Sequence, residues 1–337
     1  RHGRDRGYDP PMKSRVTIVD VAEAAGVSVA TVSKVVNERY GVAAATQVRV
    51  QGVIETLGYE SSLVARSMRA HKTHVIGVLV AEFEPFSAEI LKGAASALAE
   101  TDYELLAYTG AQRSRREGWE RRYLSRLSGT LIDGALLVTP TVSDASTSVP
   151  VVAIDPHTGP LGLPTVDSDN VTGARAATEH LVALGHRRIA FVAGRSDLAS
   201  SALREKGFRD AMAEAGLVVD PDLVRVGEYS KESARAAATE LLTLPAPPTA
   251  IFAANDLSAL ETIKVAHERG LDVPGDLSVV GFDDIPESTG GIPPLTTVHQ
   301  PIQEMGAAAT RLLVALMNGT PVDSTYVTLP TSLVVRG

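Results

Sequence analysis

The stretch Val16-Thr-Ile-Val-Asp-Val-Ala-Glu-Ala-Ala-Gly-Val-Ser-Val-Ala-Thr-Val-Ser-Lys-Val-Val-Asn37 decides the fold of the first part of the chain. It predicts a helix that begins after Thr17, with Asp20 at the capping-box position and apolar residues at helical spacing. Gly26 ends this helix, because glycine adopts positive φ at little cost. Ser28 then caps a second helix. Two helices joined at a glycine predict a helix-turn-helix, whose second helix lies in the major groove of DNA.

A third helix is predicted from about Thr46 to Leu57, and Gly58 is expected to end it. Its inward-facing residues are expected to be Val50, Val53, Ile54 and Leu57. Three short helices so close together predict a small helical bundle.

Charge divides the chain into two unequal parts. Residues 1–72 carry 11 Lys and Arg against 7 Asp and Glu, whereas residues 73–337 carry 21 against 33, although the net charge of the whole chain is −8. A small basic part before a large acidic one is expected when only the first part meets a polyanion. The excess alone is weak evidence, because a basic surface is often simply solvated.

Beyond His74 the apolar pattern changes. Short apolar runs such as Val75–Ala81 and Gly134–Val138 alternate with helical stretches, and a second such series begins near Gly173. This alternation predicts parallel sheets covered by helices on both faces, arranged as two similar lobes. Ligands bind at the carboxyl ends of the strands in such sheets, so a cleft between the lobes is the expected site.

Composition excludes several classes of protein. The chain has no cysteine, and therefore no disulfide framework, thiol nucleophile or cysteine-ligated metal. Its apolar runs are far shorter than the ~18–20 residues of a membrane span, and no secretory signal opens it, so we expect a cytoplasmic protein without membrane contact. The 8 histidines show no HExxH spacing, and no GxxxxGK[ST] or strand-linked GxGxxG loop occurs. We therefore expect no cofactor, no metal and no enzyme activity.

The quoted stretch closely resembles the DNA-binding headpiece of the lactose-repressor (LacI/GalR) family of bacterial regulators. Residues 75–337 resemble the core of the same family, which is similar in fold to periplasmic sugar-binding proteins. The markers include Ile76-Gly-Val-Leu-Val, Asp133-Gly-Ala and Val279-Val-Gly-Phe-Asp-Asp284. The resemblance implies a small all-α helix-turn-helix headpiece and an α/β periplasmic-binding-protein-like core of two lobes with parallel sheets.

The resemblance also implies domain boundaries. Residues 1–11 are expected to be a flexible tail, 12–60 the headpiece, 61–73 the hinge helix and linker, and 74–337 the effector-binding and dimerisation core. Within the core, lobe 1 is predicted to comprise about residues 74–164 and 292–320, and lobe 2 about residues 165–291 and 321–337. The crossings between lobes are expected near Pro164, Gly291 and Thr320.

A set of DNA-contacting residues follows from the resemblance. Its members are Thr17, Ser28, Val29, Ala30, Thr31, Ser33, Lys34, Asn37, Ser62, Ala65 and Met68. The resemblance implies that Thr17, Ser28, Thr31 and Asn37 anchor phosphates, whereas Val29, Ala30 and Lys34 occupy base-reading positions. Val29 and Ala30 offer apolar contact to thymine methyl groups, and Lys34 donates to guanine. The alternatives are a solvated Lys34 and an Ala30 that only fills the helix.

The segment Tyr59-Glu-Ser-Ser-Leu-Val-Ala-Arg-Ser-Met68 resembles the hinge helix of the family. Met68 stands where the family has a leucine wedged into the minor groove, and such an apolar wedge kinks the duplex. The alternative is a Met68 that packs against its dimer mate. Two departures weaken the match: Ala43 replaces a usual serine cap, and Gln47 replaces a frequent basic residue.

The resemblance places the effector site on Glu82, Phe86, Asp169, Arg204, Tyr229, Asn255 and Asp283. This chemistry suits a sugar, because carboxylates and amides bond vicinal hydroxyls, arginine offers a planar fork, and an aromatic face packs on C–H groups. The alternatives are a capping or turn role for Asp283, a surface pair of Arg204 with Glu205, and Phe86 and Tyr229 as lobe core. Asp155 and His157, beside a proline turn, are expected to be structural.

Together these features predict a homodimeric regulator that binds operator DNA as a repressor and is released by a small sugar effector. A co-repressed regulator that binds a nucleobase or other small metabolite is the alternative, and the scarcity of aromatic residues favours the sugar. The alternative from another class is a solute-binding protein, but this hypothesis gives residues 17–68 no function. No heptad tail follows the core, so a dimer is expected rather than a tetramer.

Overall fold

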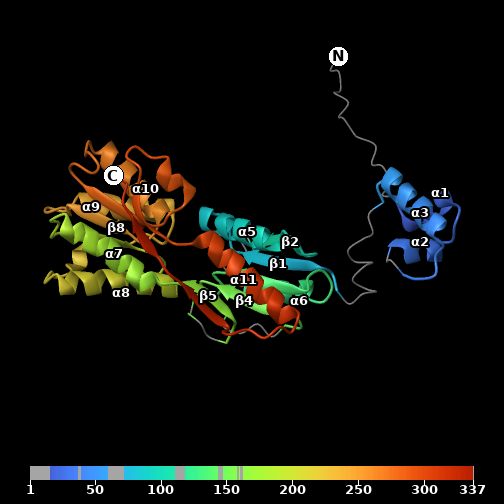
Figure 1. Cartoon of the computed structure of the whole chain (residues 1–337). Coiled ribbons are helices and arrows are strands. Elements are labelled where there is room, and N and C mark those ends of the chain that lie inside the picture. The colour runs from blue at the N-terminus through green and yellow to red at the C-terminus, as the bar shows by residue number, and fades with distance from the viewer. Residues whose placement is uncertain are drawn as a thin grey trace, which may run out of the picture. The chain divides into compact units, whose positions relative to one another are not determined.

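The computed structural model describes residues 16–36, 39–59, 72–110, 118–142, 147–157, 159 and 162–336. The chain forms two compact units, Arg1–His71 and Lys72–Gly337. The first is built from helices, and the second from helices and sheets (Figure 1).

The described part of the first unit contains helices α1 (Ile18–Ala25), α2 (Val29–Val36) and α3 (Ala44–Leu57). Thr17 and Asp20 form a reciprocal capping box: the Thr17 N–H donates to Asp20 Oδ2 over 2.6 Å, and the Asp20 N–H donates to Thr17 Oγ1 over 3.4 Å. Gly26 ends α1 with φ at 61°. The helices share a core of Val21, Ala22, Ala25, Val32, Val35 and Val50. The predicted helix-turn-helix is confirmed.

The third helix differs from its prediction at its start and on one side. It begins at Ala44 rather than Thr46, and Ala43 provides no side-chain hydrogen bond at the cap. Alanine has the highest helix propensity, so the early start needs no capping side chain. Leu57 is 36% exposed instead of buried.

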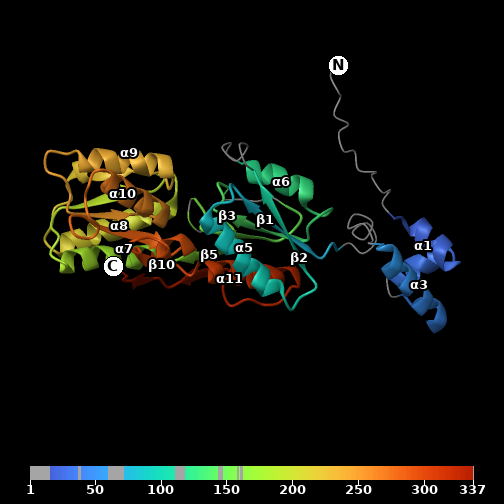
Figure 2. The ribbon, with the colours of Figure 1, turned by 90° about the horizontal axis from the view of Figure 1, so that it is seen from above.

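In the described part of the second unit the strands form two six-stranded sheets. The lobe 1 sheet has the order β11-β5-β4-β3-β1-β2, and all its pairs are parallel. Its strands are β1 (Val75–Val80), β2 (Glu104–Thr109), β3 (Gly134–Val138), β4 (Val151–Ile154), β5 (Thr165–Ser168) and β11 (Tyr326–Leu329). Helices α5 (Pro85–Leu98) and α11 (Ile302–Met317) cover one face, and α6 (Trp119–Leu127) covers the other (Figure 2).

The lobe 2 sheet has the order β12-β10-β9-β8-β6-β7, with β12 antiparallel to β10 and the other pairs parallel. Its strands are β6 (Ile189–Ala193), β7 (Val224–Val226), β8 (Ala250–Ala253), β9 (Ser278–Asp283), β10 (Thr296–His299) and β12 (Ser332–Val334). Helices α7 (Asn170–Ala183) and α8 (Ala199–Glu214) cover one face, and α9 (Lys231–Leu242) and α10 (Asp256–Glu268) cover the other. Two short 3-10 turns, η2 (Pro221–Leu223) and η3 (Pro286–Thr289), complete the lobe.

Three crossings join the lobes within the described residues. The first lies at Asp169, between β5 of lobe 1 and α7 of lobe 2. The second lies at Gln300 and Pro301, between β10 and α11, and the third at Pro330 and Thr331, between β11 and β12. These connections hold the two lobes side by side.

The predicted crossings near Pro164, Gly291 and Thr320 are wrong, each by one strand, and the predicted lobe boundaries shift with them. The reason is the composition of the strands beside the crossings. Strand β5 reads Thr-Val-Asp-Ser and β10 reads Thr-Thr-Val-His. Both lack the continuous apolar run that marks a buried parallel strand.

Helices α5 and α11 touch each other through glycine. A Cβ atom at Gly93 would lie 1.8 Å from the carbonyl oxygen of Gln303, and one at Gly306 would lie 2.2 Å from that of Ile90. Any side chain at either position would therefore force the helices apart. The contact joins two segments that the whole of α7 to β10 separates in sequence.

Within the part of the chain that the structure describes, no helix has the length and apolar character needed to cross a membrane.

Candidate functional site

The outer side of α2 in the first unit is the first candidate site. Val29, Ala30 and Lys34, the predicted base-reading residues, are all exposed there. Val32 and Val35 face the core on the other side of the same helix. This division follows from the helical period. It leaves α2 with a face free of core packing, as a helix that enters a groove requires.

The predicted phosphate-anchoring residues lie at the start of helices. Ser28 Oγ accepts the Thr31 N–H over 3.2 Å and lies 2.9 Å from Thr31 Oγ1. The Thr17 hydroxyl lies 2.8 Å from Asp20 Oδ2 and is engaged in its own capping box. N–H groups at a helix start suit a phosphate. Ser33 is half-buried on α2. Asn37, Ser62, Ala65 and Met68, with the predicted hinge helix, lie outside the described residues.

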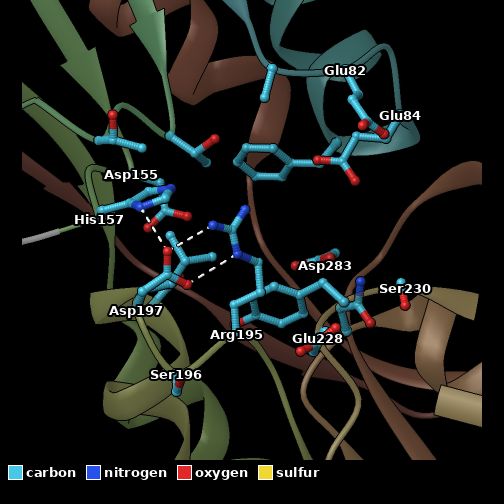
Figure 3. A pocket seen from close by; sticks show the side chains of 18 of the residues that line it. Glu82, Glu84, Asp155, His157, Arg195, Ser196, Asp197, Glu228, Ser230 and Asp283 are labelled. Carbon is cyan, nitrogen blue, oxygen red and sulfur yellow. Dashed lines mark hydrogen bonds and ion pairs between the residues drawn. The ribbon is translucent and has the colours of Figure 1, made fainter. Parts of the chain in front are cut away.

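The second candidate site is a cavity of about 1030 Å³ between the two lobes of the second unit (Figure 3). From lobe 1 it is lined by Ala81, Glu82, Glu84, Phe86, Trp119, Thr139, Thr141, Asp155 and His157. From lobe 2 it is lined by Arg195, Ser196, Asp197, Leu198, Ser200, Arg204, Glu228, Tyr229, Ser230, Asn255 and Asp283. Its volume lies at the upper end of the ~300–1,000 Å³ typical of small-molecule sites.

The cavity lies at the carboxyl ends of the parallel strands of both lobes, where open sheets bind ligands. Several lining residues there have left-handed backbone conformations: φ is 46° at Thr139, 47° at Asp155, 51° at Glu228, 57° at Tyr229 and 114° at Asp283. Such conformations cost free energy for residues other than glycine and concentrate at functional sites. Their gathering around one cavity supports it as the candidate ligand site.

The structure brings most of the predicted effector residues together in this cavity. Glu82, Phe86, Arg204, Tyr229, Asn255 and Asp283 all line it. Asp169 does not. Its Oδ1 accepts the Thr172 N–H over 3.0 Å, so Asp169 caps α7 at the first crossing. The predicted placement of Asp169 in the cleft is therefore wrong.

Other residues that line the cavity were not predicted from the sequence. Asp155 and His157, expected to be structural, both line the cavity, as do Arg195, Asp197 and Glu84. A signal was present, because Asp155 follows the apolar run of β4 and Arg195 follows that of β6 by two residues. Residues that follow parallel strands meet at one edge of the sheet.

Arg204 of α8 lies at the floor of the cavity with most of its donors used. Nε donates to Asn170 Oδ1 over 2.8 Å, and Nη2 donates to Gln300 Oε1 over 2.7 Å. Nη1 donates to the carbonyl oxygen of Ala254 over 2.6 Å and to Asp283 Oδ1 over 3.1 Å. Because Asn170 and Gln300 stand at two of the crossings, Arg204 ties lobe 2 to both.

The ion pair of Arg204 decides between two alternatives from the sequence. Its carboxylate partner is the buried Asp283, whereas Glu205 pairs with Arg209 on the surface of α8. Asp283 therefore has a long-range partner and is not merely a turn residue. The guanidinium also lies over the ring of Phe282, 3.8 Å from its centroid.

Buried carboxylates crowd around Arg204. Burial raises the pKa of Asp283 to about 6, although the charge of Arg204 opposes this shift. Burial, and then the charge of Asp167, raises the pKa of Asp155, while Arg204 again opposes. Burial also raises the pKa of Asp167. One guanidinium faces three carboxyl groups, so protons are retained here at higher pH than on ordinary carboxylates.

Glu84, at the opposite side of the cavity, has a similar environment. Its side chain is exposed to water at the cavity. The surrounding lobes nevertheless displace part of the solvent around the carboxyl group, and this desolvation raises its pKa to about 7. The charges of Asp283 and Glu82 act in the same direction, and that of Arg195 opposes them. Carboxyl groups of the two lobes therefore face each other across the cavity.

Aromatic side chains line the cavity from both lobes. Phe86 on α5 and Trp119 at the start of α6 belong to lobe 1, and Tyr229 belongs to lobe 2. The Tyr229 ring packs over Gly194, where a Cβ atom would lie 2.1 Å from Cζ of the ring. Aromatic faces beside carboxylate, amide and guanidinium groups suit a ligand with both C–H faces and hydroxyl groups. In the described part of the chain, no group of three or more His, Asp or Glu is placed to hold a metal.

Comparison with known proteins covers both units. The family described as bacterial regulatory proteins, lacI family, matches residues 17–62, and the periplasmic binding protein-like domain matches residues 178–337. The HTH-type transcriptional regulator CelR of Thermobifida fusca is 36% identical over 339 residues, which covers 96% of this chain and 98% of the relative.

Solved structures with the same arrangement of elements exist. The structure of a transcriptional regulator CelR–cellobiose complex is 35% identical, with a TM-score of 0.70, over 96% of this chain and 99% of that one. The lac repressor dimer bound to operator and the anti-inducer ONPF is 31% identical, with a TM-score of 0.81, over 96% of this chain and 98% of that one. These matches confirm the predicted combination of helical headpiece and two-lobed core.

Proposed function

The chain belongs to the lacI family of bacterial regulatory proteins and is a DNA-binding transcription regulator, and from this premise we propose that it is a repressor released from its operator by a small saccharide. The interlobe cavity carries the proposal. A ligand that contacts both lobes favours one angle between them, and it shifts the DNA-competent population by its differential affinity for the two states. Effector and operator then affect each other's affinity by the same factor.

The chemistry of the cavity supports a saccharide. Asp283 and Asn255 present acceptor and donor groups for hydroxyls, and Phe86 and Tyr229 present ring faces from opposite lobes. The relative CelR has been solved as a complex with cellobiose. We infer that this chain takes a ligand of the same general class.

On the DNA side, we propose that α2 enters the major groove with Val29, Ala30 and Lys34 toward the base edges. Their exposure on one face of α2 supports this role. The solved lac repressor is a dimer on its operator. We extend that arrangement to this chain as a homodimer whose two headpieces read the halves of a near-palindromic site.

We also propose that the cavity binds its ligand without transforming it. Arg204 and Asp283 are engaged with each other and with neighbouring groups rather than arranged as a nucleophile and its base. No cofactor is assigned to the site, and the protein is proposed to act on DNA in the cytoplasm.

A nucleobase effector that strengthens operator binding is the second candidate. The observation that favours it is the pair of aromatic residues, Phe86 and Tyr229, one from each lobe, because a flat base can be held between two ring faces.

A ligand screen with the full chain separates these candidates. Operator duplexes are first selected from a random library, and mono- and disaccharides and nucleobases are then screened for a rise in Tm. We expect a saccharide to raise Tm and to weaken operator binding in a fluorescence anisotropy titration. A nucleobase that raises Tm and strengthens operator binding supports the second candidate. Failure to select any duplex contradicts both.

A further inference from the structure

Three side chains form a connected series at one side of the interlobe cavity (Figure 3). The Arg195 guanidinium donates two parallel hydrogen bonds to Asp197, from Nε to Oδ1 over 3.0 Å and from Nη2 to Oδ2 over 2.7 Å. The same Oδ2 lies 3.3 Å from His157 Nδ1. Arg195 and Asp197 lie in lobe 2 between β6 and α8, whereas His157 lies in lobe 1 after β4. We call these residues the Arg195 relay.

His157 is fixed in lobe 1 and contacts lobe 2 twice. Its N–H donates to the carbonyl oxygen of Pro140 over 3.0 Å, and the residue is 8% exposed. Its carbonyl oxygen accepts the Ala199 N–H over 2.8 Å at the start of α8, where Leu198 offers no side-chain cap. Both this bond and the Asp197 contact pass between the lobes outside the three crossings. A change in the angle between the lobes must therefore strain or break them.

Arg195 has hydrogen-bonding capacity left for a ligand, whereas Arg204 has little. A guanidinium carries five N–H donors. In Arg204 all three guanidinium nitrogens donate hydrogen bonds to protein groups. Arg195 donates one hydrogen bond to each carboxylate oxygen of Asp197. Its other N–H donors have no partner among the described residues. Its side chain is 45% exposed to the cavity and its mouth.

The charges around Arg195 favour an uncharged acceptor. The carboxylate of Asp197 already neutralises the charge of Arg195. The charge of Arg195 also acts on the carboxyl of Glu84 and lowers its pKa. The described lining contains six carboxyl groups against two guanidiniums, so a negative surplus remains even though Glu84 and Asp155, with pKa values raised to about 7, are partly protonated near neutral pH. A ligand phosphate or carboxylate would be repelled by this negative surplus. Hydroxyl and ring oxygens of a neutral saccharide accept the free N–H donors without that penalty.

We propose that Arg195 contacts the effector directly by donating to adjacent oxygen atoms of an uncharged saccharide, and that Asp197 and His157 are positioning residues that hold it against lobe 1. This inference rests on the saccharide-responsive regulator proposed above. A ligand that accepts hydrogen bonds from Arg195 changes the hydrogen bonds between Arg195 and Asp197. It thereby also changes the contact between Asp197 and His157. Occupancy of the cavity thereby changes a contact between the lobes.

Calorimetry of the full chain, with the saccharide that stabilises the wild type, tests the direct contact. Arg195→Gln keeps a polar side chain but removes the guanidinium, and it is expected to weaken binding roughly 10- to 150-fold, the effect of losing a hydrogen bond to a charged group. Asp197→Asn keeps the shape but removes the charge that orients Arg195, and a smaller loss is expected. The matched control is Arg209→Gln, which removes an exposed arginine of α8 paired with Glu205 and is expected to leave affinity unchanged.

A double-mutant cycle tests the positioning role of His157. His157→Ala is expected to weaken saccharide binding and to reduce the factor by which saccharide weakens operator binding. His157→Gln retains an N–H donor for Asp197 and is expected to restore most of both effects. In the Arg195→Gln background, His157→Ala should cost little further affinity, because the relay is already broken. An equal loss in both backgrounds would mean a merely structural His157 and would overturn the relay.

The phosphate ester of the same saccharide tests the charge class. We expect it to bind at least about 10-fold more weakly than the parent, and equal or tighter binding overturns the uncharged class. If the wild type binds no saccharide at all, the proposed function and this inference fail together. If the wild type binds but Arg195→Gln binds equally well, this inference alone fails.

Discussion

Arg204 and Asp283 form a buried ion pair at the floor of the interlobe cavity: Nη1 lies 3.1 Å from Oδ1, and the side chains are 4% and 9% exposed. Two charges removed from water are tolerated only when their remaining donors and acceptors are also satisfied. Arg204 meets this condition through Asn170, Ala254 and Gln300. The pair therefore supports both the ligand site and the crossings between the lobes.

Replacing Arg204 should destabilise the core strongly. Arg204→Ala is expected to lower the free energy of unfolding by about 3–5 kcal/mol, because it breaks a buried pair and leaves several buried acceptors without a donor. Urea denaturation at neutral pH measures the change. Arg209→Ala, which removes an exposed pair on the same helix, should cost no more than about 1 kcal/mol. Similar losses in the two variants would contradict the role of Arg204.

The stability of the core should fall as pH rises from 6.5 to about 8. A carboxyl whose pKa is raised in the folded chain stabilises the fold while protonated, and this contribution is lost as pH rises through the folded pKa. The pKa of Glu84 is raised to about 7 by burial, and that of Asp155 is raised by burial and by Asp167. The pKa values of His157 and His186 are lowered by burial, so these two groups act in the opposite direction. Their contribution fades above the ordinary histidine pKa of about 6.5, which is why the window begins there.

Denaturation at both ends of this pH window, with matched variants, measures the effect. Glu84→Gln and Asp155→Asn should each flatten the pH dependence, whereas Glu205→Gln on the surface of α8 should leave it as in the wild type. A slope that both cavity variants preserve would assign the pH dependence to other groups.

The second unit should bind effector without the headpiece. A chain of residues 72–337 retains every described cavity residue and lacks α1 to α3. It is expected to match the full chain in saccharide affinity by calorimetry and to lose operator binding by anisotropy. The operator affinity of the full chain should fall steeply with salt, because phosphate contacts release counterions. Operator binding by the shortened chain would mean that α2 is not the DNA-reading element.

Effector binding should change the tryptophan fluorescence. The chain has a single tryptophan, and Trp119 lines the cavity while 4% exposed. A ligand beside the indole ring is expected to shift its emission in a saturable titration whose midpoint agrees with calorimetry. N-acetyltryptophanamide under the same conditions corrects for absorption by the ligand. A ligand that raises Tm without any change in emission would lie away from Trp119.

Gly194→Ala should weaken effector binding through Tyr229. The added Cβ would lie 2.1 Å from Cζ of the Tyr229 ring, so the ring must move away from its present place. We expect a loss of saccharide affinity similar to that of Tyr229→Ala, with operator affinity in the absence of saccharide maintained. The matched control is Gly290→Ala, because a Cβ at this position would meet only the carbonyl oxygen of Glu287 at 3.9 Å, an ordinary contact. Wild-type saccharide affinity in Gly194→Ala would show that Tyr229 does not contact the ligand.

Local sequence signals predicted some features of this molecule and missed others. The caps Thr17 and Ser28 and the apolar strands act through neighbouring residues, so they could be read from the sequence. Strands β5 and β10 could not be recognised, because their polar residues lie beside the crossings rather than in an apolar layer.

The roles of the site residues depend on partners far away in the sequence. Asp169 and Asp283 both stand at strand ends, yet one caps the next helix and the other pairs with Arg204, 79 positions away. The Arg195 relay was missed for the same reason, because its His157 and Asp197 come from different lobes. Composition identifies candidate groups, but only the crossing of the chain between lobes decides which of them meet.

The glycine contact between α5 and α11 has a consequence for synthesis of the protein on the ribosome. Residues from α7 to β10 are continuous and contain nearly the whole of lobe 2, whereas lobe 1 lacks α11 and β11 until the end of translation. The face of α5 that receives Gly306 therefore stays uncovered while lobe 2 emerges and folds. The usual order, in which the part made first folds first, is reversed here. Nascent chains halted before α11 should carry a folded lobe 2 that lacks only β12, beside an apolar surface that chaperones recognise.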